Sequence, residues 1–246
     1  MNILCIISKN PEKRWCVFLN AFKKYKVYII VDNNDYDLTE YKSTYKNIVF
    51  LKIEDTKCKT NGYVNGEFSG NKVINGWDKA LYYFGVENKN YDFLWLLEDD
   101  VFFHNEDTLF QIDNQYKTED LLSNVYYPNS DKNRVNPWKW DEVNIAYSEP
   151  YYSGSMYSVR ASKKMITCIN EYALKNKQIF YIEALFPTVA MKNSLKLVTP
   201  TELSNVEIVA NYERKDVNKK NVYHPEKELS IHLYYRNHLI PHLIIQ

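Results

Sequence analysis

Short apolar runs alternate with stretches of helical spacing along the first part of the chain. Two stretches, 11–25 and 71–84, repeat apolar side chains every three or four positions, the spacing of a helix that faces a core. Around them lie apolar runs that have the length of strands. These runs cover residues 2–8, 26–31, 47–53 and 91–97. Strands that alternate with helices predict βαβ units and a mostly parallel sheet, hence an α/β fold.

The second half of the chain has a less regular pattern. Helices are predicted at 161–174 and 179–190, and Pro187 is expected to interrupt the second of them. Strands are predicted at residues 121–127, 153–159 and 195–198. No internal repeat and no low-complexity linker divides the chain, so the sequence predicts one domain over residues 1–246.

Charge and cysteine usage exclude several classes of protein. The 31 basic and 31 acidic residues cancel, so no overall field would attract nucleic acid or an anionic membrane. The four cysteines include no close pair, which argues against a zinc knuckle, a redox pair or a secreted disulfide framework. No stretch reaches the roughly 20 apolar residues of a membrane span, and the short apolar start carries no basic leader. We therefore expect no transmembrane segment, reduced thiols and a cytoplasmic protein.

The most informative segment carries three consecutive carboxylates, Glu98, Asp99 and Asp100, directly after an apolar strand. Such a run is typical of a central strand buried on both faces, and open α/β sheets bind ligands at the carboxyl ends of their strands. Two carboxylates about 5 Å apart repel each other by roughly 3 kcal/mol at an effective dielectric constant of about 20. A divalent cation with oxygen ligands would relieve this repulsion and could also bridge a diphosphate. The alternative is a solvated acidic turn.

An α/β first half, an apolar strand that ends in Glu98-Asp99-Asp100, and a mixed second half together resemble the GT-A glycosyltransferases. Their D-x-D motif would here read E-D-D. The resemblance implies a GT-A-like fold with a mostly parallel central sheet and flanking helices. Residues 1–103 would be its nucleotide-binding half, and 104–246 its acceptor-binding half with the C-terminal tail. Asp100 would bind Mn²⁺ or Mg²⁺ directly, and Glu98 or Asp99 would contact the donor ribose or the metal through water.

The resemblance also places the nucleotide at the carboxyl ends of the first two strands. Ser8 and Lys9 follow the first strand, and Asp32 follows the second, where it could accept a hydrogen bond from an N–H of uracil or guanine. Asn71 and Lys72 begin a stretch that resembles the helix before the acidic strand in these enzymes, whose first turn lies against the nucleoside. Each of these side chains could instead be an ordinary turn or surface residue.

The acceptor half offers one candidate base. Glu183 is a lone carboxylate in an apolar helical segment, where burial makes a carboxylate a stronger base. The resemblance implies that it deprotonates the acceptor hydroxyl, as an Asp or Glu near such a helix does in many inverting GT-A enzymes. A structural carboxylate is the alternative, and a retaining enzyme would need no such base. Upstream, Gly154 within an aromatic strand indicates a close backbone approach, either to the donor sugar or at a bulge.

The tail supplies the remaining candidates. The resemblance implies a C-terminal histidine on the metal and a nearby cation on the diphosphate, and His224 and Lys227 fit these two roles. Imidazole is a suitable ligand for Mn²⁺, and an ammonium group stabilises the charge that grows on a departing diphosphate. His232 is the other candidate ligand.

These residues predict metal-dependent transfer of a sugar from a nucleoside-diphosphate sugar to a hydroxyl of a glycan or glycoconjugate. A sugar nucleotidyltransferase also combines an α/β sheet with carboxylate-bound Mg²⁺. It would usually carry a glycine-rich phosphate loop after the first strand, and residues 8–12 contain no glycine. The rival from another class is a carbohydrate-binding or scaffold protein that keeps the fold without catalysis.

Overall fold

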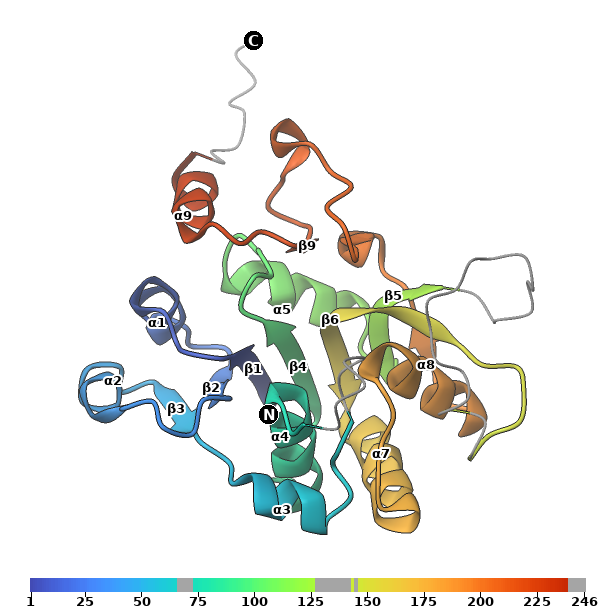
Figure 1. Ribbon diagram of the computed structural model, residues 1–246. Helices are drawn as coiled ribbons and strands as arrows, with labels where there is room; N and C mark the ends of the chain where they lie inside the picture. The colour runs from blue at the N-terminus through green and yellow to red at the C-terminus, as the bar shows by residue number, and fades with distance from the viewer. Residues whose placement is uncertain (66–72, 127–142, 144–145, 239–246) are drawn as a thin grey trace.

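The structure is a computed structural model that describes residues 1–65, 73–126, 143 and 146–238. A seven-stranded sheet runs through its centre, with strand order β3-β2-β1-β4-β6-β5-β7 (Figure 1). The strands are β1 (Asn2–Ser8), β2 (Lys26–Val31), β3 (Ile48–Leu51), β4 (Phe93–Glu98), β5 (Leu121–Tyr126), β6 (Ser153–Ser162) and β7 (Leu197–Val198).

Most neighbouring strands of this sheet are parallel. β1 pairs in parallel with β2 and β4, β2 with β3, and β5 with β7. β6 is antiparallel to both of its neighbours, β4 and β5. The predicted α/β class with a mostly parallel central sheet is therefore confirmed.

The central strand β4 divides two apolar layers. Leu94 and Leu96 belong to one core, together with side chains of the helices at 76–82, 163–176 and 182–192. Trp95 and Leu97 belong to the opposite core, together with side chains of the helices at 13–20, 39–44 and 106–115. Because successive residues of a strand face opposite sides, an uninterrupted apolar run is what a strand covered on both faces requires.

Helices cover both faces of the sheet. They are α1 (Lys13–Asn20), α2 (Thr39–Thr44), α3 (Asp55–Thr60), α4 (Gly76–Tyr82), α5 (Glu106–Gln115), α7 (Lys163–Asn176), α8 (Ile182–Lys192) and α9 (Leu229–His238). The π-helix η1 (Tyr83–Glu87) continues α4, and η2 (Thr201–Leu203) and η3 (Arg214–Asp216) are short 3₁₀ turns.

Two expectations about the helices are corrected. Within the described part of the stretch 71–84, the helix begins at Gly76, because Asn75 caps it by accepting hydrogen bonds from the amides of Trp77 and Asp78. Pro187 does not break α8, which continues through it to Lys192. The short helices α2, α3 and α5, and the C-terminal α9, were not predicted.

The C-terminal segment returns to the centre of the molecule. It forms a small parallel sheet from β8 (Asn205–Val206) and β9 (Tyr223–His224), followed by α9. In Figure 1 this orange and red segment lies beyond the end of the sheet at which β4 stops. All four cysteines are unpaired. Over the described ranges, no helix has the length and apolar character that crossing a bilayer needs.

Candidate functional site

The three consecutive carboxylates lie at the carboxyl end of the central strand. Glu98 is the last residue of β4, and Asp99 and Asp100 begin the loop that follows. β1 ends beside them, since Ile7 is paired with Glu98 in the sheet. The hydroxyl of Ser8, the last residue of β1, lies 2.5 Å from Asp99 Oδ2 and donates to it. The parallel register of β1 and β4 thus fixes the position of the acidic triplet.

Backbone hydrogen bonds attach the C-terminal segment to the same loop. Phe102 and Tyr223 exchange both of their N–H···O bonds, at 2.8 and 2.9 Å. The amide of Glu226 donates to the carbonyl of Asp100 over 2.8 Å. These bonds hold His224, which lies between the two attachment points, beside the acidic triplet although it is distant in sequence.

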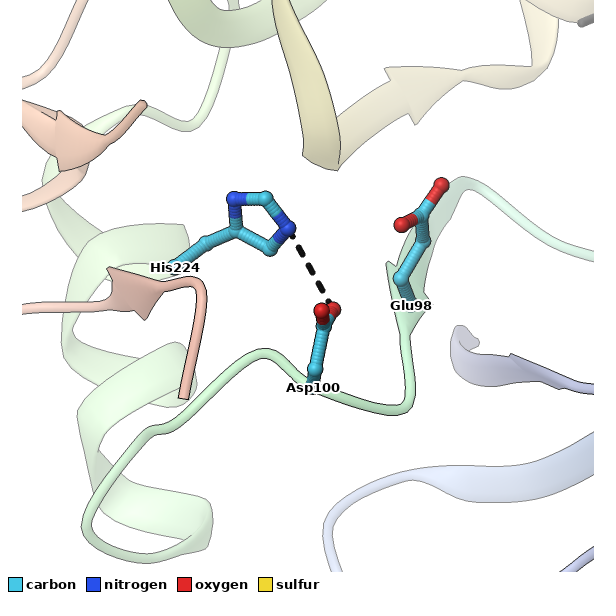
Figure 2. A group of neighbouring side chains, drawn as sticks. All are labelled: Glu98, Asp100 and His224. Carbon is cyan, nitrogen blue, oxygen red and sulfur yellow. Dashed lines mark ion pairs between the residues drawn. The ribbon is translucent and has the colours of Figure 1, made fainter. Parts of the chain in front are cut away.

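Glu98, Asp100 and His224 form one group of convergent side chains. One potential ligand atom from each lies within 4.8 Å of the others. Figure 2 shows the two carboxylates and the imidazole ring directed toward a common point, with His224 Nε2 3.3 Å from Asp100 Oδ1. His224 is buried and the two carboxylates are partly buried. This is a set of donors that could hold a divalent cation.

The second nitrogen of His224 defines its tautomer. Nδ1 lies 2.6 Å from the carbonyl oxygen of Glu207, and a carbonyl can only accept, so Nδ1 carries the proton. In the neutral ring Nε2 is then a bare acceptor facing the carboxylate of Asp100. Two acceptors at this distance need a cation between or beside them, either a proton on Nε2 or a metal ion. A ring N–H donated to a backbone carbonyl is the usual way in which proteins orient a metal-binding histidine.

Glu98 and Asp99 lie in surroundings that disfavour their charged forms. Burial raises the pKa of Glu98 to about 7, and the neighbouring charges of Asp100 and Asp99 add to this effect. The indole N–H of Trp77, which donates to Glu98 Oε1 over 2.7 Å, and the nearby His224 partly offset it. Burial also raises the pKa of Asp99, against the hydrogen bond from Ser8. A bound divalent cation would favour the charged form of each carboxylate.

An open pocket of ≈ 740 Å³ adjoins the triplet. It contains three cationic side chains, Lys9, Arg14 and Lys227, together with Asp99 and Asp100. None of the three cations forms an ion pair with any residue that the structure describes. Unpaired cations next to a carboxylate group suit a ligand that carries both phosphates and a metal ion. The full lining is Lys9, Asn10, Glu12, Arg14, Trp15, Asp99, Asp100 and Lys227.

Asp32 has a partner that the sequence did not reveal. The ammonium group of Lys79 lies 2.8 Å from Asp32 Oδ1 and 3.3 Å from Asp55 Oδ1, and it donates to the carbonyl of Asp32. The side chain of Lys79 is only 2 % exposed. Asp32 is therefore the counter-ion of a buried lysine, and it does not line the pocket of Lys9 and Lys227. Its contact with a nucleobase stays a prediction.

The other predicted residues are placed as follows. Glu183 is buried in the first turn of α8, and it is not among the side chains grouped with Asp100 and His224. Asn71 and Lys72 lie outside the described residues. Gly154 approaches a neighbouring strand, because a Cβ there would lie 2.5 Å from the carbonyl oxygen of Asn124. This supports the bulge interpretation, and β5 and β6 do shift register beside it.

The second candidate histidine makes different contacts. His232 Nε2 lies 2.7 Å from the carbonyl oxygen of Glu226, so this nitrogen carries the proton. Its ring packs edge-on against Trp15 and Phe102 in the interior. Of the two histidines, His224 is the one that the structure groups with Glu98 and Asp100.

Sequence reasoning missed several residues that shape the site. Trp77 was expected in the core and is buried there, but its hydrogen bond to Glu98 could not be foreseen. Tyr157 stacks on His224 with ring centroids 3.9 Å apart and an interplanar angle of 10°. Arg14 had a weak signal, since it is basic and close to the end of the first strand. Lys79 and the carbonyl of Glu207 had none, because their partners lie far away in the chain.

Comparisons with known proteins bear on the fold. No protein-family model and no curated protein matches the chain. The galactosyltransferase LgtC, solved with donor and acceptor sugar analogues, is 9 % identical with a TM-score of 0.47, and the match covers 81 % of this chain and 73 % of that chain. Mouse xyloside xylosyltransferase 1 is 8 % identical with a TM-score of 0.43, covering 81 % of this chain and 85 % of that chain.

A synthase is also among the similar solved structures. The 4-diphosphocytidyl-2C-methyl-D-erythritol synthase of Anaerococcus prevotii is 13 % identical with a TM-score of 0.46, and the match covers 85 % of this chain and 91 % of that chain. Glycosyltransferases thus occur among the solved structures similar to this chain. Because these TM-scores are low, we argue function from the residues of this chain alone.

Proposed function

We propose that this protein is a metal-dependent glycosyltransferase that uses a nucleoside-diphosphate sugar as donor. The observation that carries the proposal is the convergence of His224 Nε2 with the carboxylates of Asp100 and Glu98, while Nδ1 is held by the carbonyl of Glu207. This donor set of two carboxylates and one imidazole fits Mn²⁺, and Mg²⁺ less well because it prefers oxygen ligands. When bound, the cation would act as a Lewis acid that neutralises charge on the diphosphate.

Residues around Glu98, Asp100 and His224, here called the metal group, supply the remaining contacts to the donor. Lys9, Arg14 and Lys227 bring unpaired positive charge to the adjoining pocket and would bind the phosphate oxygens. Lys227 follows His224 closely, so the same C-terminal turn holds both a metal ligand and a phosphate ligand. Ser8 orients Asp99 by its hydrogen bond, which leaves the other carboxylate oxygen of Asp99 for the ribose or for a metal-bound water.

Glu183 is our candidate for the base that deprotonates the acceptor hydroxyl in an inverting reaction. It is buried at the start of α8, and α8 packs against β6, the strand beside β4. Phe186 of the same helix contacts Trp77, with ring centroids 6.2 Å apart, and Trp77 holds Glu98. A Glu183→Gln variant should retain donor binding and lose transfer. If the variant transferred sugar as fast as the native protein, Glu183 would be excluded as the base. A reaction that retains the configuration at the anomeric carbon would then be favoured.

The acceptor would be a hydroxyl of a glycan or glycoconjugate, and we expect no nucleic acid ligand because the net charge is zero. We place the reaction in the cytoplasm, since four cysteines without disulfide partners are typical of a reducing compartment.

A metal titration tests the proposal at its carrying observation. Mn²⁺ binding would be followed by electron paramagnetic resonance, alone and with UDP or GDP, for the native protein, Asp100→Asn and His224→Gln. We expect both variants to bind Mn²⁺ at least about tenfold more weakly and to lose the metal-dependent binding of the nucleotide. Asp107→Asn is the matched control, because Asp107 is exposed in α5 and pairs with Lys24 on the surface. Equal Mn²⁺ affinity in Asp100→Asn and Asp107→Asn would overturn the proposed site.

The products of turnover separate the rival functions. Mn²⁺-dependent release of a nucleoside diphosphate from UDP- or GDP-sugars, absent in Asp100→Asn, is the expected result. Release of pyrophosphate from a nucleoside triphosphate and a sugar phosphate would instead identify a nucleotidyltransferase. Sugar binding with no effect of metal or nucleotide would identify a carbohydrate-binding protein.

A further inference from the structure

A second pocket lies between the 3₁₀ turn η3 and helix α9. Its volume is ≈ 560 Å³, within the range of small-molecule binding sites. The turn contributes two cations and the helix contributes one hydroxyl, one aliphatic and two aromatic side chains. The lining residues are Arg214, Lys215, Ser230, Ile231, Tyr234 and Tyr235. The lining includes no carboxylate, unlike that of the pocket beside Asp99 and Asp100.

Two polar groups of this pocket lack partners. Tyr235 is 3 % exposed, and its hydroxyl is buried without a hydrogen-bond partner among the residues that the structure describes. A buried hydroxyl left unpaired costs about 1–3 kcal/mol, so it indicates a place where a ligand supplies the missing bond. Arg214 forms no ion pair in the described part of the chain, although its charge lowers the pKa of the nearby Glu226 carboxyl against the effect of burial. Lys215 contacts the exposed Glu213 at 2.7 Å. Arg214 is therefore the cation of this pocket that no ion pair holds.

The aromatic side chains make the pocket suitable for a sugar ring. Tyr234 remains 58 % exposed, although its ring stacks on His238 with centroids 4.3 Å apart. Ile231 adds an aliphatic surface to the lining. A pyranose ring presents C–H groups on its face and hydroxyls at its edge, so it can contact Tyr234 and Ile231 while it bonds to Tyr235 and Ser230. Such a mixture of apolar surface and a few polar groups is usual in ligand sites.

The pocket is built on the same segment as the metal group. Ile231 and Tyr235 pack in one apolar cluster with Phe102 and Tyr223, which are the two residues that tie His224 to the loop after Asp100. The turn between β9 and α9 links the two pockets, with Lys227 in the first and Ser230 in the second. A molecule bound at η3 and α9 would therefore contact the same C-terminal segment that carries His224 and Lys227.

We propose that this second pocket binds an acidic sugar, with its carboxylate on Arg214 and Lys215 and its ring against Tyr234. Tyr235 and Ser230 would bond to its hydroxyls. If the proposed transferase function holds, this sugar belongs to the acceptor, and the enzyme extends an acidic glycan. The binding itself requires neither the metal nor the nucleotide, so it is measured separately.

The test compares two disaccharides that differ in a single group. Cellobiouronic acid and cellobiose share the same linkage, and the first carries a carboxylate where the second carries a hydroxymethyl group. Binding to the full chain would be followed by saturation-transfer NMR and by isothermal titration. We expect cellobiouronic acid to bind at least about tenfold more tightly than cellobiose, as a charge-assisted hydrogen bond to an arginine requires. Equal binding of the two sugars would overturn the proposal.

Variants locate the binding. Arg214→Gln should weaken the binding of cellobiouronic acid about tenfold or more, whereas Lys220→Gln, which removes the same charge outside the pocket, should not. Tyr235→Phe removes only the unpartnered hydroxyl, so we expect a folded protein that binds about threefold to tenfold more weakly. Equal effects of Arg214→Gln and Lys220→Gln would show a non-specific charge effect and would exclude the pocket.

The same samples distinguish this proposal from the transferase proposal. Asp100→Asn should lose Mn²⁺ binding and still bind cellobiouronic acid. Arg214→Gln should bind Mn²⁺ as the native protein does and bind cellobiouronic acid more weakly. If the native protein binds Mn²⁺ but does not prefer cellobiouronic acid to cellobiose, only the acidic-sugar proposal is contradicted. If it prefers cellobiouronic acid but does not bind Mn²⁺, only the transferase proposal is contradicted.

Discussion

The proposed metal ligands Glu98 and His224 are held by residues that would not themselves bind the ion. Trp77 donates to Glu98 Oε1, the carbonyl of Glu207 fixes the tautomer of His224, and Tyr157 covers one face of the imidazole ring. Each of these contacts restricts a ligand to one orientation before the ion arrives. Metal affinity therefore depends on outer residues as well as on the ligands themselves.

Trp77→Phe is expected to weaken Mn²⁺ binding about tenfold. Phenylalanine keeps much of the ring packing against Phe186 and removes the N–H that orients Glu98. Trp95→Phe is the matched control, because the indole of Trp95 donates to Asp113 over 3.1 Å, in the apolar layer opposite that of Trp77. Both variants should be less stable than the native protein in urea unfolding. Only Trp77→Phe should bind Mn²⁺ more weakly, as followed by electron paramagnetic resonance. A similar loss of affinity in both would assign Trp77 a purely structural role.

Stability should fall in mild acid because of His232. Burial lowers the pKa of His232 to about 4 from the ordinary value of 6.5. Below about pH 6.5 the unfolded chain takes up a proton that the folded protein does not bind until about pH 4. The free energy of unfolding contributed by this residue therefore decreases across that window, by up to about 3 kcal/mol.

Urea titrations between pH 4 and pH 7.5 check this expectation. His232→Gln should be less stable at neutral pH and should show a flatter pH dependence. His238→Gln should follow the native protein, because His238 lies on the exposed side of the same helix. If the free energy of unfolding of His232→Gln changed with pH as steeply as that of the native protein, the acid sensitivity would arise from other groups.

At the scale of elements, the docking of α9 onto α1 and the loop after β4 completes the region around the site. Arg236 of α9 makes this contact. Its guanidinium group lies 3.6 Å from the ring centre of Phe18 and 5.2 Å from that of Trp15, and it donates to the carbonyl of Phe103 over 3.3 Å. Burial lowers the pKa of Arg236 to about 9. A planar cation between aromatic rings is a role for which lysine is a poor substitute.

Arg236→Lys should therefore destabilise the protein by about 1–2 kcal/mol, through the loss of cation–π contact and of the bond to Phe103. Urea unfolding at neutral pH measures the change. Arg214→Lys is the control, because Arg214 is exposed and forms no ion pair within the described ranges, so its replacement should alter stability by less than about 0.5 kcal/mol. Equal stability of the two variants would show that the aromatic contacts of Arg236 contribute little.

At the scale of the whole molecule, one buried polar group connects β1, β2, β4, β6 and α5. Asp113 of α5 accepts hydrogen bonds from Tyr25, directly before β2, and from Asn2 and Trp95. It also lies 3.5 Å from the guanidinium of Arg160 in β6, which is fully buried. Asn2 begins β1, so the network extends to the amino ends of the parallel strands, opposite the metal group. The protein thus keeps a purely structural charge pair at one end of the sheet and its candidate chemistry at the other.

Asp113→Asn should destabilise the fold by about 3–5 kcal/mol, since it leaves Arg160 as a buried charge without a counter-ion. Asp107→Asn makes the same substitution in an exposed ion pair of the same helix and should cost less than about 1 kcal/mol. Denaturant unfolding of both variants provides the comparison. A small effect of Asp113→Asn would mean that the backbone carbonyls of Tyr116 and Glu119, which also accept from Arg160, satisfy the charge by themselves.

Neighbouring residues along the chain encode where the strands lie and where the acidic triplet falls among them. β1 and β2 were predicted to the residue, whereas β4 starts two residues later and ends one residue later than the predicted 91–97, so that it includes Glu98. These features are local: apolar runs and their polar ends are encoded in neighbouring residues. A local pattern must extend over several turns to be recognised, and α2 and α3 are too short to show a helical period. These two helices were therefore missed. The continuation through Pro187 depends on the packing of α8, which no local pattern records.

Contacts between residues far apart in the chain depend on the three-dimensional fold. The choice between His224 and His232 follows from the pairing of Tyr223 with Phe102, two segments far apart in the chain. Lys79 reaches Asp32 through the packing of α4 beside β1 and β2. A hydrogen bond or ion pair between remote segments leaves no periodic signal in the sequence, because it depends on strand register and on how the chain returns to the sheet. For that reason the sequence indicated a cation at β4, and the fold selected the imidazole beside it.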